Sequence, residues 1–110
     1  MQIDCVTWFR YQYRAYQKLL FSVPNGGRRF AREAQILKAE GVVAGVSDLI
    51  LLVPASGYNG LCLEMKIKPN KQSEYQKEWQ LLVQNQNYKY EVIYSLEQFR
   101  ETINKYLDGK

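Results

Sequence analysis

Two short apolar segments between Gly45 and Lys66 hold the residues of this 110-residue sequence that are best suited to chemistry. Asp48 opens the first segment, and Glu64 and Lys66 interrupt the second. Side chains alternate between the two faces of a strand, so Glu64 and Lys66 are expected on the same face. A buried carboxylate without a partner is costly or titrates at a shifted pKa, so these residues require a partner.

Two interpretations of this trio remain open from the residues alone. In the first, Lys66 forms an ion pair with Glu64 or Asp48 at a solvated end of a sheet. In the second, the two carboxylates, a backbone carbonyl and waters hold Mg²⁺ or Mn²⁺, which prefer oxygen ligands. Such an ion would polarise a phosphoryl oxygen and lower the pKa of an attacking water, while Lys66 would orient that water or offset developing charge.

The composition excludes several kinds of catalytic and metal site. The sequence contains no histidine, which excludes Ser-His and Cys-His nucleophilic catalysis, histidine metal sites and an imidazole base. Cys5 and Cys62 form neither a CxxC pair nor a disulfide framework, so we expect two reduced, buried thiols. No apolar run approaches the roughly 20 residues that span a bilayer, and the N-terminus lacks a signal-peptide pattern, so we expect a soluble, cytoplasmic protein.

The formal net charge is +4, and basic residues gather around Arg28 to Lys38 and around Lys66 to Lys77. Such clusters match an electrostatic footprint for phosphate, although many basic proteins bind no nucleic acid. The turn that precedes Arg28 has exposed backbone amides that could seat a phosphate, and a plain solvent turn fits it equally well. The candidate nucleic-acid-binding residues are Asn25, Gly26, Gly27, Arg28, Arg29, Lys38 and Lys68.

The rest of the sequence predicts the elements that would position the trio. Apolar spacings of three and four predict helices, apolar and β-branched runs predict strands, and Ser73-x-x-Gln76 and Ser95-x-x-Gln98 have capping-box spacing. The expected order is helix 2–18, strand 19–23, helix 28–40, strand 48–53, strand 61–68, helix 73–86, strand 90–94 and a final helix from 95 to about 107. We therefore expect one α/β domain, residues 1–110, with helices on both faces of a small mixed sheet.

Four linked motifs resemble those of a known family. They are P-N-G-G-R-R at 24–29, L-K-A-E-G-V-x-x-G-V-S-D-L at 37–49, G-L-C-L-E-M-K at 60–66 and Q-S-x-x-Q-K-E-W at 72–79. Asp48 followed by Glu64-x-Lys66 resembles the PD-(D/E)XK nuclease motif. The linked motifs resemble, more narrowly, the VRR-NUC (virus-type replication-repair nuclease) family over residues 19 to about 108.

The resemblance implies a restriction-endonuclease-like PD-(D/E)XK core and a role for each matching residue. Asp48 and Glu64 would be metal ligands together with the main-chain carbonyl of Met65, and Lys66 would be the catalytic lysine. Gln76 would support the site from its helix. Capping of that helix explains Gln76 equally well, and the two roles are compatible if the side chain turns toward the sheet.

Two positions depart from the family pattern. Ser47 stands where the family usually has Pro, which changes backbone stiffness but removes no ligand. The family also usually carries an acidic residue early in the first helix, a few positions before a glutamine. If Gln2 is that glutamine, the acidic residue would lie before Met1; otherwise Asp4 substitutes or the ligand is absent from this chain.

The implied function is that of a DNA endonuclease that depends on Mg²⁺ or Mn²⁺. Stand-alone members of the family are similar to Holliday-junction resolvases that act as homodimers, so the resemblance implies branched DNA as the substrate and a homodimer as the active form. The alternative is a non-catalytic nucleic-acid-binding module on the same fold. A third possibility is an unrelated α/β interaction domain whose basic residues are solvated.

Overall fold

The computed structural model describes residues 1–24 and 31–109 of the chain, with side chains from residue 35 onward in the second part. The predicted order of helices and strands is confirmed. The elements are α1 (Gln2–Gln12), the 3-10 helix η1 (Arg14–Tyr16), β1 (Leu20–Ser22), α2 (Ala31–Ala39), β2 (Leu49–Leu51), β3 (Leu61–Met65), α3 (Glu74–Asn85), β4 (Lys89–Ile93) and α4 (Leu96–Asp108).

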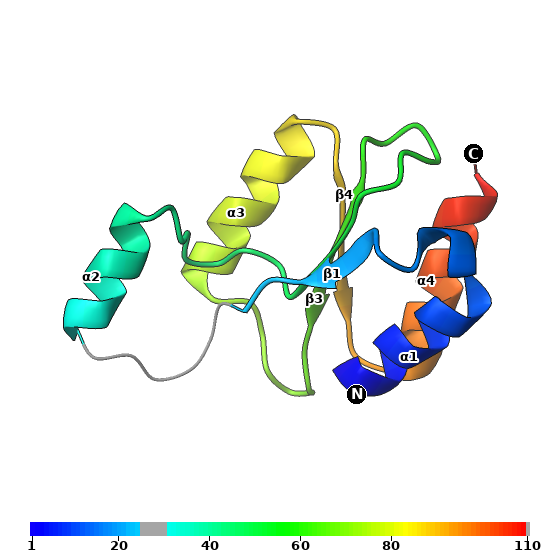
Figure 1. Ribbon diagram of the computed structural model, residues 1–110, viewed down its shortest axis with the longest axis horizontal. Coiled ribbons are helices and arrows are strands. Elements are labelled where there is room, and N and C mark those ends of the chain that lie inside the picture. The colour runs from blue at the N-terminus through cyan, green and yellow to red at the C-terminus, as the bar shows by residue number, and fades with distance from the viewer. Residues whose placement is uncertain (25–30, 110) are drawn as a thin grey trace.

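The four strands form one mixed sheet in the order β1-β2-β3-β4. β1 and β2 are antiparallel, as are β2 and β3, whereas β3 and β4 are parallel. A parallel pair needs a long crossover, and α3 supplies it. Figure 1 shows α3 on one face of the sheet and α1 with α4 on the other. The predicted α/β class, with helices on both faces of a small mixed sheet, is therefore confirmed.

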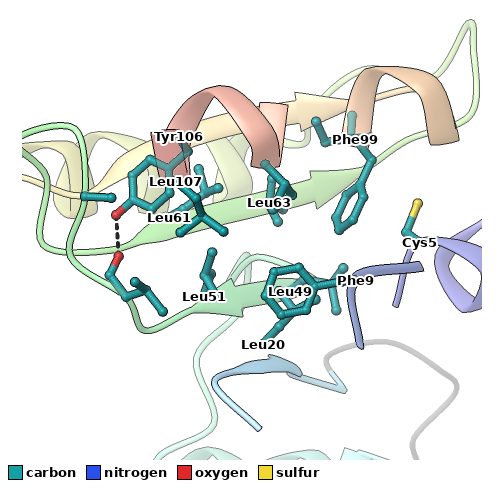
Figure 2. Packing of buried hydrophobic residues seen from close by; sticks show 14 residues of the cluster. Cys5, Phe9, Leu20, Leu49, Leu51, Leu61, Leu63, Phe99, Tyr106 and Leu107 are labelled. Carbon is teal, nitrogen blue, oxygen red and sulfur yellow. Dashed lines mark hydrogen bonds between the residues drawn. The ribbon is translucent and has the colours of Figure 1, made fainter. Parts of the chain in front are cut away.

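The hydrophobic core fills the space between the sheet and the pair α1 and α4 (Figure 2). Alternate residues of β2 and β3 face this core, because side chains of a strand alternate between its faces. Phe9 reaches the core from α1 and Phe99 from α4. The Tyr106 hydroxyl donates a hydrogen bond of 2.6 Å to the carbonyl oxygen of Val53 at one end of it.

The opposite face of the sheet, toward α3, is more polar. Glu64 in β3 and Tyr90 in β4 are directed to this side, where Gln76 and Trp79 of α3 meet them. The sheet thus separates an apolar core on one face from a cluster of polar side chains on the other. Cys5 and Cys62 are both buried and free, as predicted. No helix within residues 1–24 and 31–109 is long and apolar enough to cross a membrane.

Several predicted boundaries were wrong. The first helix ends at Gln12 instead of residue 18, because Tyr13 leaves the helical region with φ −123° and ψ 64°. Its ring nevertheless stacks on Phe9, with 5.5 Å between centroids, so the apolar periodicity continues where the helix does not. The helix predicted for 28–40 covers Ala31–Ala39 in the described part of the chain, and residues 28–30 lie outside that part.

Three strands are shorter than predicted: β1 covers Leu20–Ser22, β2 Leu49–Leu51 and β3 Leu61–Met65, whereas β4 (Lys89–Ile93) keeps the predicted length and begins one residue earlier. At the end of β3, the Met65 N–H donates to the Asp48 side chain, and β2 begins only at Leu49. The apolar residues that follow each strand therefore belong to connecting segments.

Both predicted helix N-termini occur where the serines place them. Ser73 and Gln76 form a complete capping box: the Gln76 N–H donates to the serine hydroxyl, and the Ser73 N–H donates to Oε1 of Gln76 at 2.8 Å. Ser95 likewise accepts from the Gln98 N–H at 3.0 Å. Its box is not reciprocal, because Oε1 of Gln98 accepts from the N–H of Tyr94, one residue earlier.

Candidate active site

The start of β2 and the end of β3 bring Asp48 and Glu64 together. The antiparallel register pairs Leu49 with Leu63, and one further step of the same register places Asp48 opposite Glu64. Oδ2 of Asp48 accepts a hydrogen bond of 2.7 Å from the N–H of Met65. The two carboxylates, separated by 15 intervening residues in the sequence, thus meet at one end of the sheet.

Glu64 is buried, with 1% of its surface exposed, and both of its carboxylate oxygens accept hydrogen bonds. Nε2 of Gln76 donates to Oε2 at 2.8 Å, and the hydroxyl of Tyr90 donates to Oε1 at 3.3 Å. Gln76 therefore makes a capping contact and a contact to Glu64 at the same time. Its Oε1 caps α3 while its Nε2 contacts Glu64.

The surroundings of Glu64 disfavour its ionised form in the absence of a cation. Burial is the main cause that raises the pKa of Glu64, and the neighbouring carboxylate of Asp48 raises it further by hydrogen bonding and by its like charge. Lys66 and the Tyr90 hydroxyl lower it, and the result is a pKa of about 8. Two adjacent carboxylates with this balance would be stabilised by a bound cation.

Asp48 and Glu64 are the acidic side chains of the site. No group of three His, Cys, Asp or Glu side chains among the described residues could hold a metal ion. Asp4, exposed on α1, therefore does not join the pair. Two carboxylates still fit Mg²⁺, which is commonly bound through one or two carboxylates and keeps several waters. The donor set, all oxygen, also matches Mn²⁺.

Lys66 follows β3 directly and is half-buried, and its N–H donates to the carbonyl of Ile93 at 2.8 Å. The ion pairs between described side chains join Lys77 to Glu74 and Lys89 to Glu91. Neither includes Lys66, so the simple ion-pair interpretation of the trio is not what the structure contains. Lys66 is nevertheless close enough to Glu64 to lower the pKa of that carboxylate.

The candidate nucleic-acid-binding residues lie in different parts of the chain. Asn25, Gly26, Gly27, Arg28 and Arg29 lie outside the described residues. Lys38 is exposed on α2, which lies beyond α3 and away from α1 and α4 in Figure 1. Lys68 is exposed shortly after β3, with its Nζ 5.6 Å from the ring centroid of Tyr94.

Two polar side chains that form hydrogen bonds behind Glu64 cannot be recognised from the sequence. The sequence places Tyr90 in a predicted strand and Gln72 at the start of a motif, and neither pattern indicates a contact with Glu64. Nε2 of Gln72 donates to the Tyr90 hydroxyl at 3.0 Å, and that hydroxyl donates to Glu64. The available signal was alternation in β4, since Tyr90 and Val92 share the face of the sheet that Glu64 occupies.

The mixed sheet with helices on both faces is the α/β fold that the sequence predicts for a nuclease domain. The model of the VRR-NUC domain family matches residues 3–97, and the chain belongs to that family. A solved structure described as a VRR_NUC domain protein is similar in fold, with a TM-score of 0.85 at 23% sequence identity. The match covers 98% of this chain and 85% of that one. A search of the curated proteins finds no match.

Membership of this family implies a nuclease-type function and DNA binding. Nucleases of the family typically depend on a divalent metal.

Proposed function

We propose that residues 1–110 form a single nuclease domain that hydrolyses phosphodiester bonds of DNA with the help of a divalent cation. The observation that carries this proposal is the placement of Asp48 opposite Glu64, with Lys66 beside them and no ion pair between that lysine and either carboxylate in the described part of the chain.

Asp48 and Glu64 would hold Mg²⁺ or Mn²⁺, joined by the main-chain carbonyl of Met65. The N–H of Met65 is directed at Asp48, and the N–H and C=O of one strand residue point to the same neighbouring strand, so we expect its carbonyl on the side of β2. When bound, the cation polarises a phosphoryl oxygen and lowers the pKa of a water.

The other site residues would act on the orientation of the reacting groups. Lys66, as a half-buried ammonium, would orient the attacking water or offset charge that develops on the phosphate. Gln76 would hold Oε2 of Glu64 in place, and its own orientation is fixed because its Oε1 is engaged by the Ser73 N–H.

For the substrate we propose branched DNA, in particular a four-way junction, cut by a homodimer in the cytoplasm. A two-fold dimer places two active sites at a fixed separation, which paired incisions require. The net charge of +4 favours binding to phosphate. The residues proposed to contact the DNA backbone are Asn25, Gly26, Gly27, Arg28, Arg29, Lys38 and Lys68.

Cleavage of an end-labelled four-way junction tests the proposal, with a linear duplex of the same sequence as the comparison substrate. We expect paired nicks in the junction with Mg²⁺ and none with a chelator. Asp48→Asn and Lys66→Ala should each lower the rate by at least about 100-fold, as expected for loss of a group that stabilises developing charge.

Lys105→Ala is the matched control, because Lys105 is an exposed lysine on α4, on the face of the sheet opposite α3 and the proposed site. It should cleave like the unmodified chain. Robust cleavage by Lys66→Ala would overturn the role given to that lysine. Junction binding without cleavage, with either Mg²⁺ or Mn²⁺, would identify a non-catalytic nucleic-acid-binding module instead.

A further inference from the structure

A chain of hydrogen-bonded side chains lies behind Glu64 and has no role in the function proposed above. Tyr90, 7% exposed, donates to Oε1 of Glu64. Its own oxygen accepts from Nε2 of Gln72, and the same Nε2 donates to Oε1 of Gln80 at 2.9 Å. The ring of Tyr90 is packed by Trp79 of α3, with 6.2 Å between the ring centroids.

The direction of these hydrogen bonds is set by the groups themselves. A tyrosine hydroxyl has a single hydrogen. Because the Gln72 amide donates to the hydroxyl oxygen of Tyr90, that hydrogen is left for Glu64. On the other side, the Ser73 N–H engages Oε1 of Gln76, so the amide nitrogen is what faces Glu64.

Both oxygens of Glu64 are therefore held by donors that are themselves fixed by further hydrogen bonds. A carboxylate oxygen has two lone pairs, so each oxygen keeps one for another partner. The two donors approach from β4 and α3, and Asp48 lies on the side of β2. The donors thus leave the side of Glu64 that faces Asp48, where the two carboxyl groups hydrogen-bond to each other in the metal-free chain and where a shared cation would replace that contact.

We propose that Tyr90, held in place by Gln72, is a positioning residue that fixes the orientation of the Glu64 carboxylate for binding of a divalent cation. This proposal rests on the proposed function. Side chains that hydrogen-bond to a metal ligand commonly contribute about 10–100-fold to metal affinity. Tyr90 would act in this way although it does not itself touch the ion or the DNA.

A buried tyrosine could also serve stability alone, and the chain contains a matched control for that role. Tyr106 is 1% exposed, and its hydroxyl donates to the backbone oxygen of Val53 within the hydrophobic core (Figure 2). The core lies on the face of the sheet opposite Glu64. Tyr106→Phe and Tyr90→Phe each remove one buried hydroxyl, but only the second removes a contact to a proposed ligand.

Calorimetric titration with Mn²⁺ and Mg²⁺ separates the possibilities, using the unmodified chain, Glu64→Gln, Tyr90→Phe and Tyr106→Phe. We expect the unmodified chain to bind one ion per chain and Glu64→Gln to lose that binding. Tyr90→Phe should bind about 10–100-fold more weakly, and Tyr106→Phe should keep the original affinity even if its melting temperature falls.

A second variant tests the pathway through Gln72. Gln72→Met should weaken binding in the same direction as Tyr90→Phe, and the double variant should be no weaker than Tyr90→Phe alone, because residues that act through one contact are not additive. In cleavage assays, Tyr90→Phe should need more Mg²⁺ for half-maximal rate but approach the original rate at saturation.

Unchanged affinity in Tyr90→Phe, with binding abolished in Glu64→Gln, would overturn the positioning role and leave the proposed function intact. Equal losses in Tyr90→Phe and Tyr106→Phe would also overturn it, since a general loss of structure would then explain both. Absence of any ion binding that depends on Glu64 in the unmodified chain would overturn the proposed function together with this inference.

Discussion

Glu64 is a carboxylate near the end of an otherwise apolar strand, and its environment sets its charge. Burial raises its pKa most, and the adjacent Asp48 adds to this, so the pKa rises from an ordinary value of 4.5 to about 8. In the absence of a cation, the folded chain therefore holds a proton at Glu64 more tightly than the unfolded chain does. Stability then depends on pH in a direction that can be stated in advance.

We expect the metal-free protein to lose stability as the pH rises from about 4.5 to about 8, because the folded state must give up a proton that it favours. Glu64→Gln removes this titration. Between pH 4.5 and pH 8, the melting temperature of the unmodified chain should therefore fall relative to that of Glu64→Gln. Thermal unfolding followed by circular dichroism with a chelator present measures it.

Addition of Mg²⁺ near pH 8 should raise the melting temperature of the unmodified chain and leave that of Glu64→Gln unchanged, because only a ligand that binds the folded state stabilises it. Melting temperatures of the two proteins that run parallel from pH 4.5 to pH 8 would contradict the raised pKa of Glu64.

Single residues of the site differ in how readily their sequence context reveals them. Asp48 and Glu64 are conspicuous because carboxylates are rare in buried strands. Gln76 is found through its capping spacing, but its second contact depends on how α3 meets the sheet. The sequence does not single out Tyr90, because tyrosine is common in strands and its type does not show which side chain its hydroxyl will contact.

Among the elements, α3 must approach the sheet closely for Gln76 to reach Glu64, and Gly45 permits this. Gly45 adopts φ +88°, and a Cβ at that position would overlap the carbonyl oxygen of Tyr75 in the first turn of α3. It would also lie 2.9 Å from the backbone nitrogen of Gln76. The neighbours in the way are backbone atoms, which cannot rotate aside.

We expect Gly45→Ala to displace the start of α3 and so to weaken both stability and Mg²⁺ binding. Gly57→Ala is the control, because Gly57 has a similar φ of +82° but nothing within 4 Å of the added carbon. The positive φ alone should cost about 1–3 kcal/mol in each variant. The overlap at Gly45 should add about 1–3 kcal/mol.

Urea denaturation gives the two free energies of unfolding, and calorimetry gives the ion affinities. Gly57→Ala should keep the original affinity for Mg²⁺. Equal losses of stability in the two variants, with unchanged ion binding in both, would contradict the role of Gly45 in seating α3.

The elements themselves were predictable in type and order but less so in length. Residues 13–16 continue the apolar spacing of the first helix, yet Tyr13 packs on Phe9 from outside the helix. Likewise, Val53 belongs to the apolar run of β2 and is buried, although that strand ends at Leu51. Apolar periodicity records which residues are buried, and a residue can be buried without continuing the element before it.

At the scale of the whole molecule, the α/β class and the helices on both faces follow from the order of elements. The strand order and the mixed pairing do not, because they depend on contacts between segments far apart in the sequence. The antiparallel pair β2 and β3 places the start of one strand beside the end of the next. That arrangement explains why Asp48 and Glu64 meet at one end of the sheet.

The same arrangement places the hydrophobic core and the proposed site on opposite faces of the sheet. The face that packs on α1 and α4 holds the hydrophobic core (Figure 2), and the face toward α3 holds the polar cluster around Glu64. Substitutions at the proposed site can therefore be made without opening the core, which is what allows their effects on ion binding to be interpreted.

The central claim is that Asp48 and Glu64 share one divalent cation, and a crystal structure of the protein soaked in Mn²⁺, read from anomalous scattering, tests it most directly. The account predicts one peak in contact with both carboxylates and with the main-chain carbonyl of Met65, absent from crystals of Asp48→Asn. A protein that cleaves DNA but shows no ion between these two carboxylates would contradict it.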